Sequence, residues 1–265
     1  MTELTDPWAD RAFLRDVQYR TDANLAARQS IYSYQEPRID LQGRVIDLAS
    51  PGAGEIVCDV GCGNGMYLAE LARRGFAGRV LGLDLSVGML GAARERLGTV
   101  AGVGLLAADA TELPLRDDVA DLTLALHMLY HVPDPSQALR ELRRVTRPGG
   151  RVIIVLNGPD HLRELRAIVA EARGDEIWGQ RERLRLDGGE VLAGRYFSSV
   201  TRHDFVSELR IPDPEPVADY VRSMSGTQHR ADPERLVASV LARFPAAPGA
   251  VFTVTTHAGC LICTV

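Results

Sequence analysis

Lysine is absent from the 265-residue sequence, so all 30 of its basic residues are arginine. Without a lysine amine we expect neither Schiff-base chemistry nor a phosphate-binding loop that ends in Gly-Lys-Ser/Thr. The 35 acidic residues outnumber the arginines and give a net charge of −5. Because this charge is negative, no general electrostatic attraction draws the chain to nucleic acid or to anionic lipid, and we expect neither as a partner.

Cysteine is scarce as well. Cys58, Cys62, Cys260 and Cys263 are too few for a disulfide framework in a chain of this length. Cys260 and Cys263 have the spacing of a redox pair or of half a zinc site. A redox pair normally opens a helix, but only two residues follow Cys263, and residues three apart in a strand point to opposite faces. We therefore expect packing roles for the cysteines and no metal site.

Long apolar runs are also missing, since no run approaches the roughly 18 residues that a membrane-spanning helix needs. The first 16 residues are acidic and interrupted, unlike the apolar centre of a secretion signal. We therefore expect a cytoplasmic protein without a membrane partner. The use of arginine alone as the basic residue suggests a GC-rich coding sequence and favours a bacterial source.

The middle of the chain, residues 50–158, alternates short apolar runs with helical patterns. The apolar runs that predict strands are residues 56–60, 80–83, 103–107, 122–126 and 152–156. Runs with so little polar alternation are typical of strands buried on both faces of a parallel sheet. Ser86 and the pair Asp134-Pro135 are start signals for helices between these runs. This order predicts an α/β fold with a doubly wound, Rossmann-like sheet.

The two ends of the chain have residue patterns that differ from that of the middle. Residues 1–49 look helical and amphipathic, and we expect them to form an N-terminal lid. Residues 159–265 mix helical stretches with two closing strands at 251–256 and 261–265, separated by a turn. A proline-rich break begins a partly helical insertion at about residues 212–245, which we expect to cover the substrate.

A glycine-rich turn follows the first apolar run, in the order Asp59-Val60-Gly61-Cys62-Gly63-Asn64-Gly65. Glycines at a corner between strand and helix let the backbone approach a ligand, and the helix N-terminus offers unpaired N–H donors. The spacing is Gly-x-Gly-x-Gly rather than the Gly-x-Gly-x-x-Gly of dinucleotide sites. Asp59 would repel a pyrophosphate but would attract an ammonium or sulfonium group. The turn therefore favours a cationic nucleoside over NAD.

Two further acidic residues follow apolar runs. Asp84 lies 19 positions past Gly65, about where an acidic residue binds ribose hydroxyls. Its alternative role is a helix cap, although Ser86 already serves there. Asp109 ends the third run, where it could accept a hydrogen bond from the exocyclic amine of adenine, or could instead cap a turn toward Thr111.

Together these motifs resemble the class I S-adenosylmethionine-dependent methyltransferases of the small-molecule type. The resemblance covers about residues 56–156, including Asp121–Val132 and the Pro-Gly-Gly before the fifth run. It implies a seven-stranded sheet with an antiparallel last strand, S-adenosyl-L-methionine as cofactor and S-adenosyl-L-homocysteine as product. It also implies that the cofactor is contacted by Asp59, Gly61 and Asn64 at the methionine end, by Asp84 at the ribose, by Leu85, Met89, Asp109 and Ala110 around adenine, and by His127 from the substrate side of the sulfonium.

Residues outside these motifs are less clearly assigned. Tyr19 and Arg28 could fold over the cofactor, with Arg28 binding its carboxylate, but a solvated helix face explains them nearly as well. Methyl transfer is an in-line displacement, so positioning can supply most of the rate, although an oxygen or carbon nucleophile can also need a base. The catalytic candidates are His127 and His131, and the string that begins at His131 favours a structural role for that residue.

The sequence thus predicts a methyltransferase that acts on an oxygen, nitrogen or carbon atom of a small organic molecule, with secondary metabolism as one setting. One alternative is a regulatory or interaction protein that binds S-adenosylmethionine without turnover. The other is a Rossmann oxidoreductase that uses NAD, which the glycine spacing and Asp59 disfavour.

Overall fold

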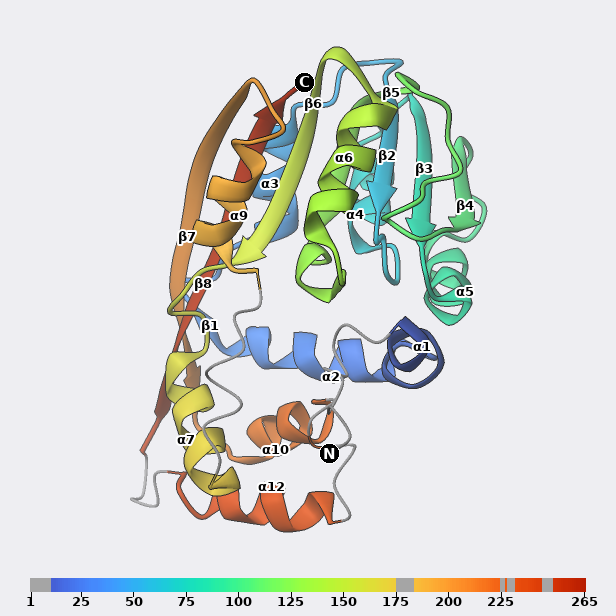
Figure 1. Cartoon of the computed structure of the whole chain (residues 1–265). Coiled ribbons are helices and arrows are strands. Elements are labelled where there is room, and N and C mark those ends of the chain that lie inside the picture. The colour runs from blue at the N-terminus through green and yellow to red at the C-terminus, as the bar shows by residue number, and fades with distance from the viewer. Residues whose placement is uncertain (1–10, 175–183, 225–226, 228–231, 245–249) are drawn as a thin grey trace, which may run out of the picture.

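The computed structural model describes residues 11–174, 184–224, 227, 232–244 and 250–265 (Figure 1). Its strands form one eight-stranded sheet in the order β1-β7-β8-β6-β5-β2-β3-β4. The strands are β1 (Gln35–Glu36), β2 (Ile56–Val60), β3 (Arg79–Asp84), β4 (Val103–Ala107), β5 (Ala120–Leu126), β6 (Thr146–Asn157), β7 (Ser199–Ile211) and β8 (Phe252–Thr264). The neighbours from β6 to β4 pair in parallel, and β8 is antiparallel to both β6 and β7.

The predicted α/β sheet with an antiparallel last strand is therefore confirmed, with two differences. The sheet has eight strands rather than seven, because the two-residue strand β1 adds to the edge by pairing with β7. The prediction of two closing strands was wrong, because residues 251–256 and 261–265 belong almost entirely to the single strand β8. Gly259 lies in that strand, and a Cβ there would clash with the side chain of Leu186. This glycine serves a close approach between strand and helix, and it forms no turn.

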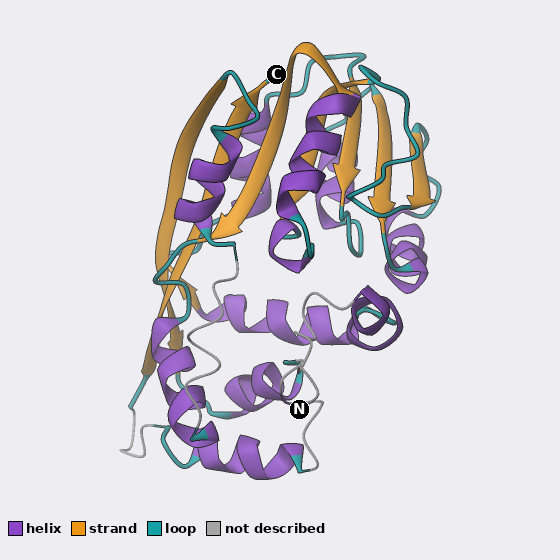
Figure 2. Cartoon of the chain, viewed as in Figure 1, coloured by secondary structure: helices purple, strands orange, loops and turns teal. Residues whose placement is uncertain are grey.

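Helices cover both faces of the sheet (Figure 2). Buried side chains of α6 (Pro135–Val145) and α9 (Leu186–Ala193) pack on one face. Those of α3 (Leu41–Ala49), α4 (Met66–Arg73) and α5 (Val87–Leu97) pack on the other. Cys263 belongs to the first core and Cys260 to the second, so the two thiols lie on opposite faces, as their spacing in a strand predicted.

A third apolar cluster lies beyond the sheet. The long strands β7 and β8 extend past their neighbours (Figure 1). Three helices pack beside this extension: α7 (Arg163–Arg173), α10 (Glu215–Arg222) and α12 (Pro233–Leu241). These three helices share one buried apolar core, and we call the three helices together the helical cap. The cap includes α7, which precedes the insertion predicted at residues 212–245.

The N-terminal residues connect the sheet and the cap. The short helices α1 (Arg11–Phe13) and η1 (Leu14–Gln18) lead into α2 (Ala23–Ser30) and η2 (Ile31–Tyr34). Figure 1 shows α2 lying between the carboxyl ends of the parallel strands and the cap. No helix in the described parts of the chain combines the length and apolar character needed to cross a membrane.

Candidate functional site

A cavity of about 660 Å³ lies where the sheet, α2 and the helical cap meet. Its walls come from the glycine turn after β2, the carboxyl ends of β3, β5 and β6, the N-terminal helices, and Tyr220 with Met224 from the cap. Ligands in open α/β sheets bind outside the carboxyl ends of the strands, at the point where the strand order reverses. That reversal falls between β2 and β5, so this cavity is at the expected place.

The glycine turn has a geometry that only glycine adopts easily. Gly61, Gly63 and Gly65 have φ angles of 75°, 55° and 75°. A Cβ on Gly61 would lie 2.6 Å from the Cβ of Met128. The amides of Gly61 and Cys62 both donate to the carbonyl of Leu83, at 2.7 and 3.0 Å. These bonds tie the turn to β3 and place it at the cavity wall, where α4 begins at once.

The carboxyl of Asp59 is buried at the cavity wall. Its side chain is 1% exposed, and neither oxygen has a hydrogen bond within the described residues. Burial, with the nearby charge of Asp84 as a smaller cause, raises the pKa of Asp59 from 3.8 to about 7. A buried carboxylate without a partner is costly, so this position is suited to a ligand that brings a positive charge or hydrogen-bond donors.

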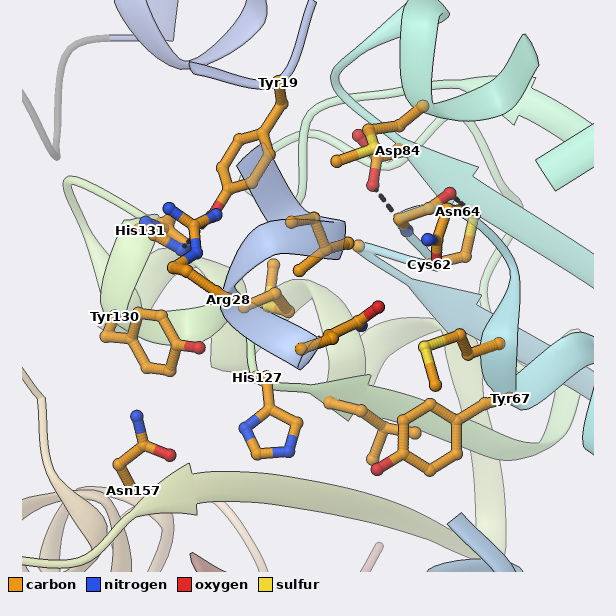
Figure 3. Close-up of a pocket in the computed structure, with 18 of the residues that line it drawn as sticks. Tyr19, Arg28, Cys62, Asn64, Tyr67, Asp84, His127, Tyr130, His131 and Asn157 are labelled. Carbon is orange, nitrogen blue, oxygen red and sulfur yellow. Dashed lines mark hydrogen bonds between the residues drawn. The ribbon is translucent and has the colours of Figure 1, made fainter. Parts of the chain in front are cut away.

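Asp84 ends β3 and bridges two turns. One carboxylate oxygen accepts from the amide of Gly63 at 2.8 Å (Figure 3). The other accepts from the amide of Ser86 at 2.8 Å. The hydroxyl of Ser86 caps α5 by accepting from the amide of Met89 at 3.2 Å, so the predicted cap is confirmed. Burial raises the pKa of Asp84. Each of its oxygens retains acceptor capacity, which suits the paired hydroxyls of a ribose.

Asp109 is occupied by protein groups. One of its oxygens accepts from both the amide and the hydroxyl of Thr111, at 2.8 and 2.7 Å. The guanidinium of Arg11 lies 3.0 Å from the other oxygen. The turn role considered for Asp109 is therefore present, and contact with adenine stays a prediction. Leu85, Met89 and Ala110 also line the cavity, although Met89 is only 2% exposed and belongs equally to the core.

Tyr19 and Arg28 point into the cavity, contrary to the alternative of a solvated helix face. The guanidinium of Arg28 donates to the Tyr19 hydroxyl at 3.2 Å and to the carbonyl of Ser223 at 3.2 Å. The Tyr19 hydroxyl is 2.9 Å from Nε2 of His131. Figure 3 shows these three side chains together on one side of the cavity, away from Asn64 and Asp84. They connect the N-terminal helices to the loop after β5 and to the cap.

The two histidine candidates differ in their surroundings. His131 lies in η3 (Leu129–His131), and its Nε2 is engaged with Tyr19, which favours the structural role considered above. His127 follows β5 with a φ of 58°, and its amide donates to the carbonyl of Val155 at 2.9 Å. No described residue forms a hydrogen bond with the His127 ring. Burial lowers the pKa of His127 to about 4, so the ring is neutral at pH 7.

The sequence analysis missed several polar residues of the cavity wall: Tyr32, Tyr67, Asn157, His161 and Tyr220. Only Asn157 carried a usable signal, because it directly follows the fifth predicted strand. Tyr67 has a buried hydroxyl without a hydrogen-bond partner in the described residues, and burial raises its pKa. The described residues contain no cluster of histidine, cysteine and acidic side chains that would bind a metal. The predicted absence of a metal site stays a prediction.

Comparison with known proteins identifies the family. A family model described as a methyltransferase domain matches residues 58–154. The chain is 32% identical to malonyl-[acyl-carrier protein] O-methyltransferase of Serratia marcescens, over 71% of this chain and 69% of the relative. It is 44% identical to demethylmenaquinone methyltransferase of Mycobacterium marinum, over 39% of this chain and 42% of the relative. The match spans less than half the length of this relative and of several others.

The fold is also similar to that of solved structures. A crystal structure from Bacillus halodurans superposes with a TM-score of 0.64 at 16% identity, covering 85% of this chain and 99% of that one. The unpaired carboxyl of Asp59, the glycine turn and the bridging Asp84 fit a ligand that carries an amino group, a sulfonium and a ribose. S-adenosylmethionine is accordingly the methyl donor. The chain belongs to the class I S-adenosylmethionine-dependent methyltransferases.

Proposed function

We propose that this enzyme methylates a small organic molecule held between the N-terminal helices and the helical cap. The relatives are named for different acceptors, a malonyl group on a carrier protein and demethylmenaquinone, so their names do not define the acceptor of this chain. The cavity supports a small acceptor, because its volume of about 660 Å³ is in the usual range for small-molecule pockets. Residues 1–49, of which residues 1–10 lie outside the described residues, would then act as the lid, residues 50–158 as the cofactor-binding core and the cap as the acceptor wall.

The cofactor roles follow from the polar groups that remain available. Asp59 would attract the ammonium of the methionine part, with the backbone of Gly61 and the side chain of Asn64 beside it. Asp84 would accept hydrogen bonds from the ribose hydroxyls. Arg28 would bind the carboxylate and Tyr19 would close over it, since both already point into the cavity. The wall around adenine would consist of Leu85, Met89, Asp109 and Ala110.

The acceptor side requires positioning more than strong base catalysis. Bound S-adenosylmethionine supplies an electrophilic methyl group on a positively charged sulfur. His127 directly follows β5 and lines the cavity, and its neutral ring can hold the proton of an acceptor hydroxyl or amine in a hydrogen bond. Because burial lowers the pKa of His127 to about 4, the ring is a weak base at pH 7. We therefore assign His127 to orientation of the nucleophilic atom.

The single observation that carries the cofactor assignment is the buried, unpartnered carboxyl of Asp59 beside the glycine turn. The decisive experiment is calorimetric titration with S-adenosylhomocysteine, with NAD as the competing ligand and Asp84→Ala as the variant. We expect micromolar binding of S-adenosylhomocysteine, at least tenfold weaker in the variant, or about 1.4 kcal/mol. NAD should not bind. Equal affinity in the variant would contradict the ribose role of Asp84, and binding of NAD alone would contradict the whole assignment.

A further inference from the structure

Part of the cavity wall consists of polar side chains that carry no formal charge at pH 7. Its lining includes His127, Asn157, His161, Tyr32 and Tyr220. Burial lowers the pKa of His161 to about 3 and that of His127 to about 4, so both rings are neutral at pH 7. Figure 3 shows His127, Tyr130 and Asn157 facing the same region.

The charged lining residues lie elsewhere. Asp59 lies in β2, Asp84 ends β3 and Asp109 follows β4, and all three are assigned to the cofactor. Arg11 pairs with Asp109 and Arg15 with Asp16, whereas Arg38 is exposed to solvent. The remaining charge, on Arg28, acts on Tyr32 and opposes the rise of its pKa. In the proposed complex the carboxylate of the cofactor neutralises this charge. An acceptor bound beyond His127 would therefore meet neutral hydrogen-bonding groups and aromatic rings. A charged acceptor would be desolvated there without a counter-ion, which is costly.

One hydrogen-bonding pair in this region has a defined direction. The hydroxyl of Tyr32 lies 3.0 Å from Nε2 of His161, and the two rings are stacked with their centroids 6.3 Å apart. Nδ1 of His161 accepts from the backbone amide of His257 at 3.2 Å. A neutral imidazole that accepts at Nδ1 carries its proton on Nε2, so His161 donates to the oxygen of Tyr32.

The direction of this bond leaves the proton of Tyr32 available. Because His161 donates to the Tyr32 oxygen, the hydroxyl proton of Tyr32 does not take part in that bond. Burial and the neighbouring Tyr220 and Tyr130 hold the pKa of Tyr32 well above its usual value, so the hydroxyl stays protonated. The bond also joins η2 of the N-terminal region to the segment before α7. Tyr32 is thus a hydrogen-bond donor held in place on the acceptor side.

We propose that the acceptor is an uncharged molecule with a hydroxyl or carbonyl oxygen on an apolar or aromatic skeleton, and that Tyr32 donates a hydrogen bond to that oxygen. This inference rests on the proposed function, since it places the acceptor in the same cavity as the cofactor. In this arrangement His127 and Asn157 also form hydrogen bonds with the oxygen-bearing group of the acceptor. Tyr32 is a specificity-determining residue, and His161 is the positioning residue that fixes the direction of its hydrogen bond.

Three probes with one ring system test the charge preference: 1-naphthol, 1-naphthoate and 1-naphthylmethylammonium, which are neutral, anionic and cationic at pH 7. Each is titrated calorimetrically into the full chain saturated with S-adenosylhomocysteine. We expect 1-naphthol to bind at least about tenfold more tightly than either charged probe. Tyr32→Phe should weaken 1-naphthol binding by about three- to tenfold, the usual effect of one neutral hydrogen bond. Binding of S-adenosylhomocysteine should stay within twofold of the parent.

Tyr34→Phe is the matched control, because Tyr34 lies in the same helix η2, loses the same hydroxyl and does not line the cavity. It should bind all probes like the parent. If S-adenosylhomocysteine binds but a charged probe binds as well as 1-naphthol, or no probe binds, the inference is overturned and the proposed cofactor site stands. Equal weakening in both tyrosine variants would also overturn it. If S-adenosylhomocysteine itself does not bind, the proposed function fails first.

Discussion

The two parts of the cavity are built in different ways. Most of the cofactor part lies in residues 59–89, which run along β2, the glycine turn, α4, β3 and the start of α5. The other residues assigned to the cofactor are Tyr19, Arg28, Asp109 and Ala110. The acceptor part brings together Tyr32, Asn157, His161 and Tyr220, which come from the N-terminal helices, the end of β6, the segment before α7 and the cap. The first part is a local motif on a rigid sheet, and the second exists only when distant segments pack together. Substitutions should therefore affect the two parts separately.

The largest change in stability is expected from substitution of Asp59, because its buried carboxylate is unfavourable in the ligand-free protein. A rise of its pKa from 3.8 to about 7 corresponds to about 4 kcal/mol of lost stability above pH 7. Asp59→Asn removes the charge but leaves a buried amide, so we expect it to stabilise the ligand-free protein by about 2 to 4 kcal/mol at pH 8. The same variant should bind S-adenosylhomocysteine more weakly by at least about tenfold. Chemical denaturation and calorimetry measure the two effects.

The pH dependence provides the control for Asp59. The unfolded carboxyl releases its proton near pH 3.8, whereas the folded one keeps it up to about pH 7. Between these values the unfolded state binds fewer protons, so the contribution of Asp59 to stability is fully present below pH 3.8 and is lost as the pH rises through 7. Asp59→Asn should lack this decline, so the difference in stability between variant and parent should grow across the same interval. A constant difference from pH 4 to pH 8 would contradict a raised pKa at Asp59.

Gly61→Ala should produce the next largest effect. The substitution puts a side chain at a φ of 75° and brings its Cβ to 2.6 Å from Met128, so the unfolding free energy should fall by about 3 kcal/mol. Gly75→Ala is the matched control, since Gly75 has a φ of 70° but no atom within 4 Å of the added Cβ, and it should cost about 1 kcal/mol. Thermal or urea unfolding compares the two. Equal losses would show that Met128 moves away freely and that close packing does not restrict the turn.

The same contrast explains how much of the molecule could be predicted from sequence. Ser86, Asp134 and the apolar runs of the middle region carry local signals, since caps and buried strands depend on neighbours in the chain. The glycine turn and Asp84 could likewise be recognised from their spacing along the chain, and the cofactor roles proposed for them began from that spacing. The single strand β8 was misread as two, because Gly259 looks like a turn residue until Leu186 of α9 packs against it. Tyr32 and His161 are 129 residues apart, and no local pattern records their hydrogen bond.

Substitution of Asn157 should have the smallest effect on folding and on cofactor binding. It therefore tests whether the acceptor part can be changed without changing the cofactor part. Its side chain lines the cavity at the end of β6 and has no hydrogen bond within the described residues. Asn157→Ala should therefore change the unfolding free energy by less than about 0.5 kcal/mol and leave S-adenosylhomocysteine binding within about twofold. Binding of 1-naphthol should fall by about three- to fivefold, because one neutral polar partner is lost.

Asn157→Asp makes this prediction sharper, because it changes the charge with almost no change in shape. A carboxylate among the neutral groups of the acceptor part should weaken binding of 1-naphthol and strengthen binding of 1-naphthylmethylammonium, and so reverse the preference between the two probes. Calorimetric titration in the presence of S-adenosylhomocysteine measures both affinities. If Asn157→Asp instead weakened cofactor binding as much as probe binding, its charge would act on the whole cavity. The distinction between a locally encoded cofactor part and a separately assembled acceptor part would then be wrong.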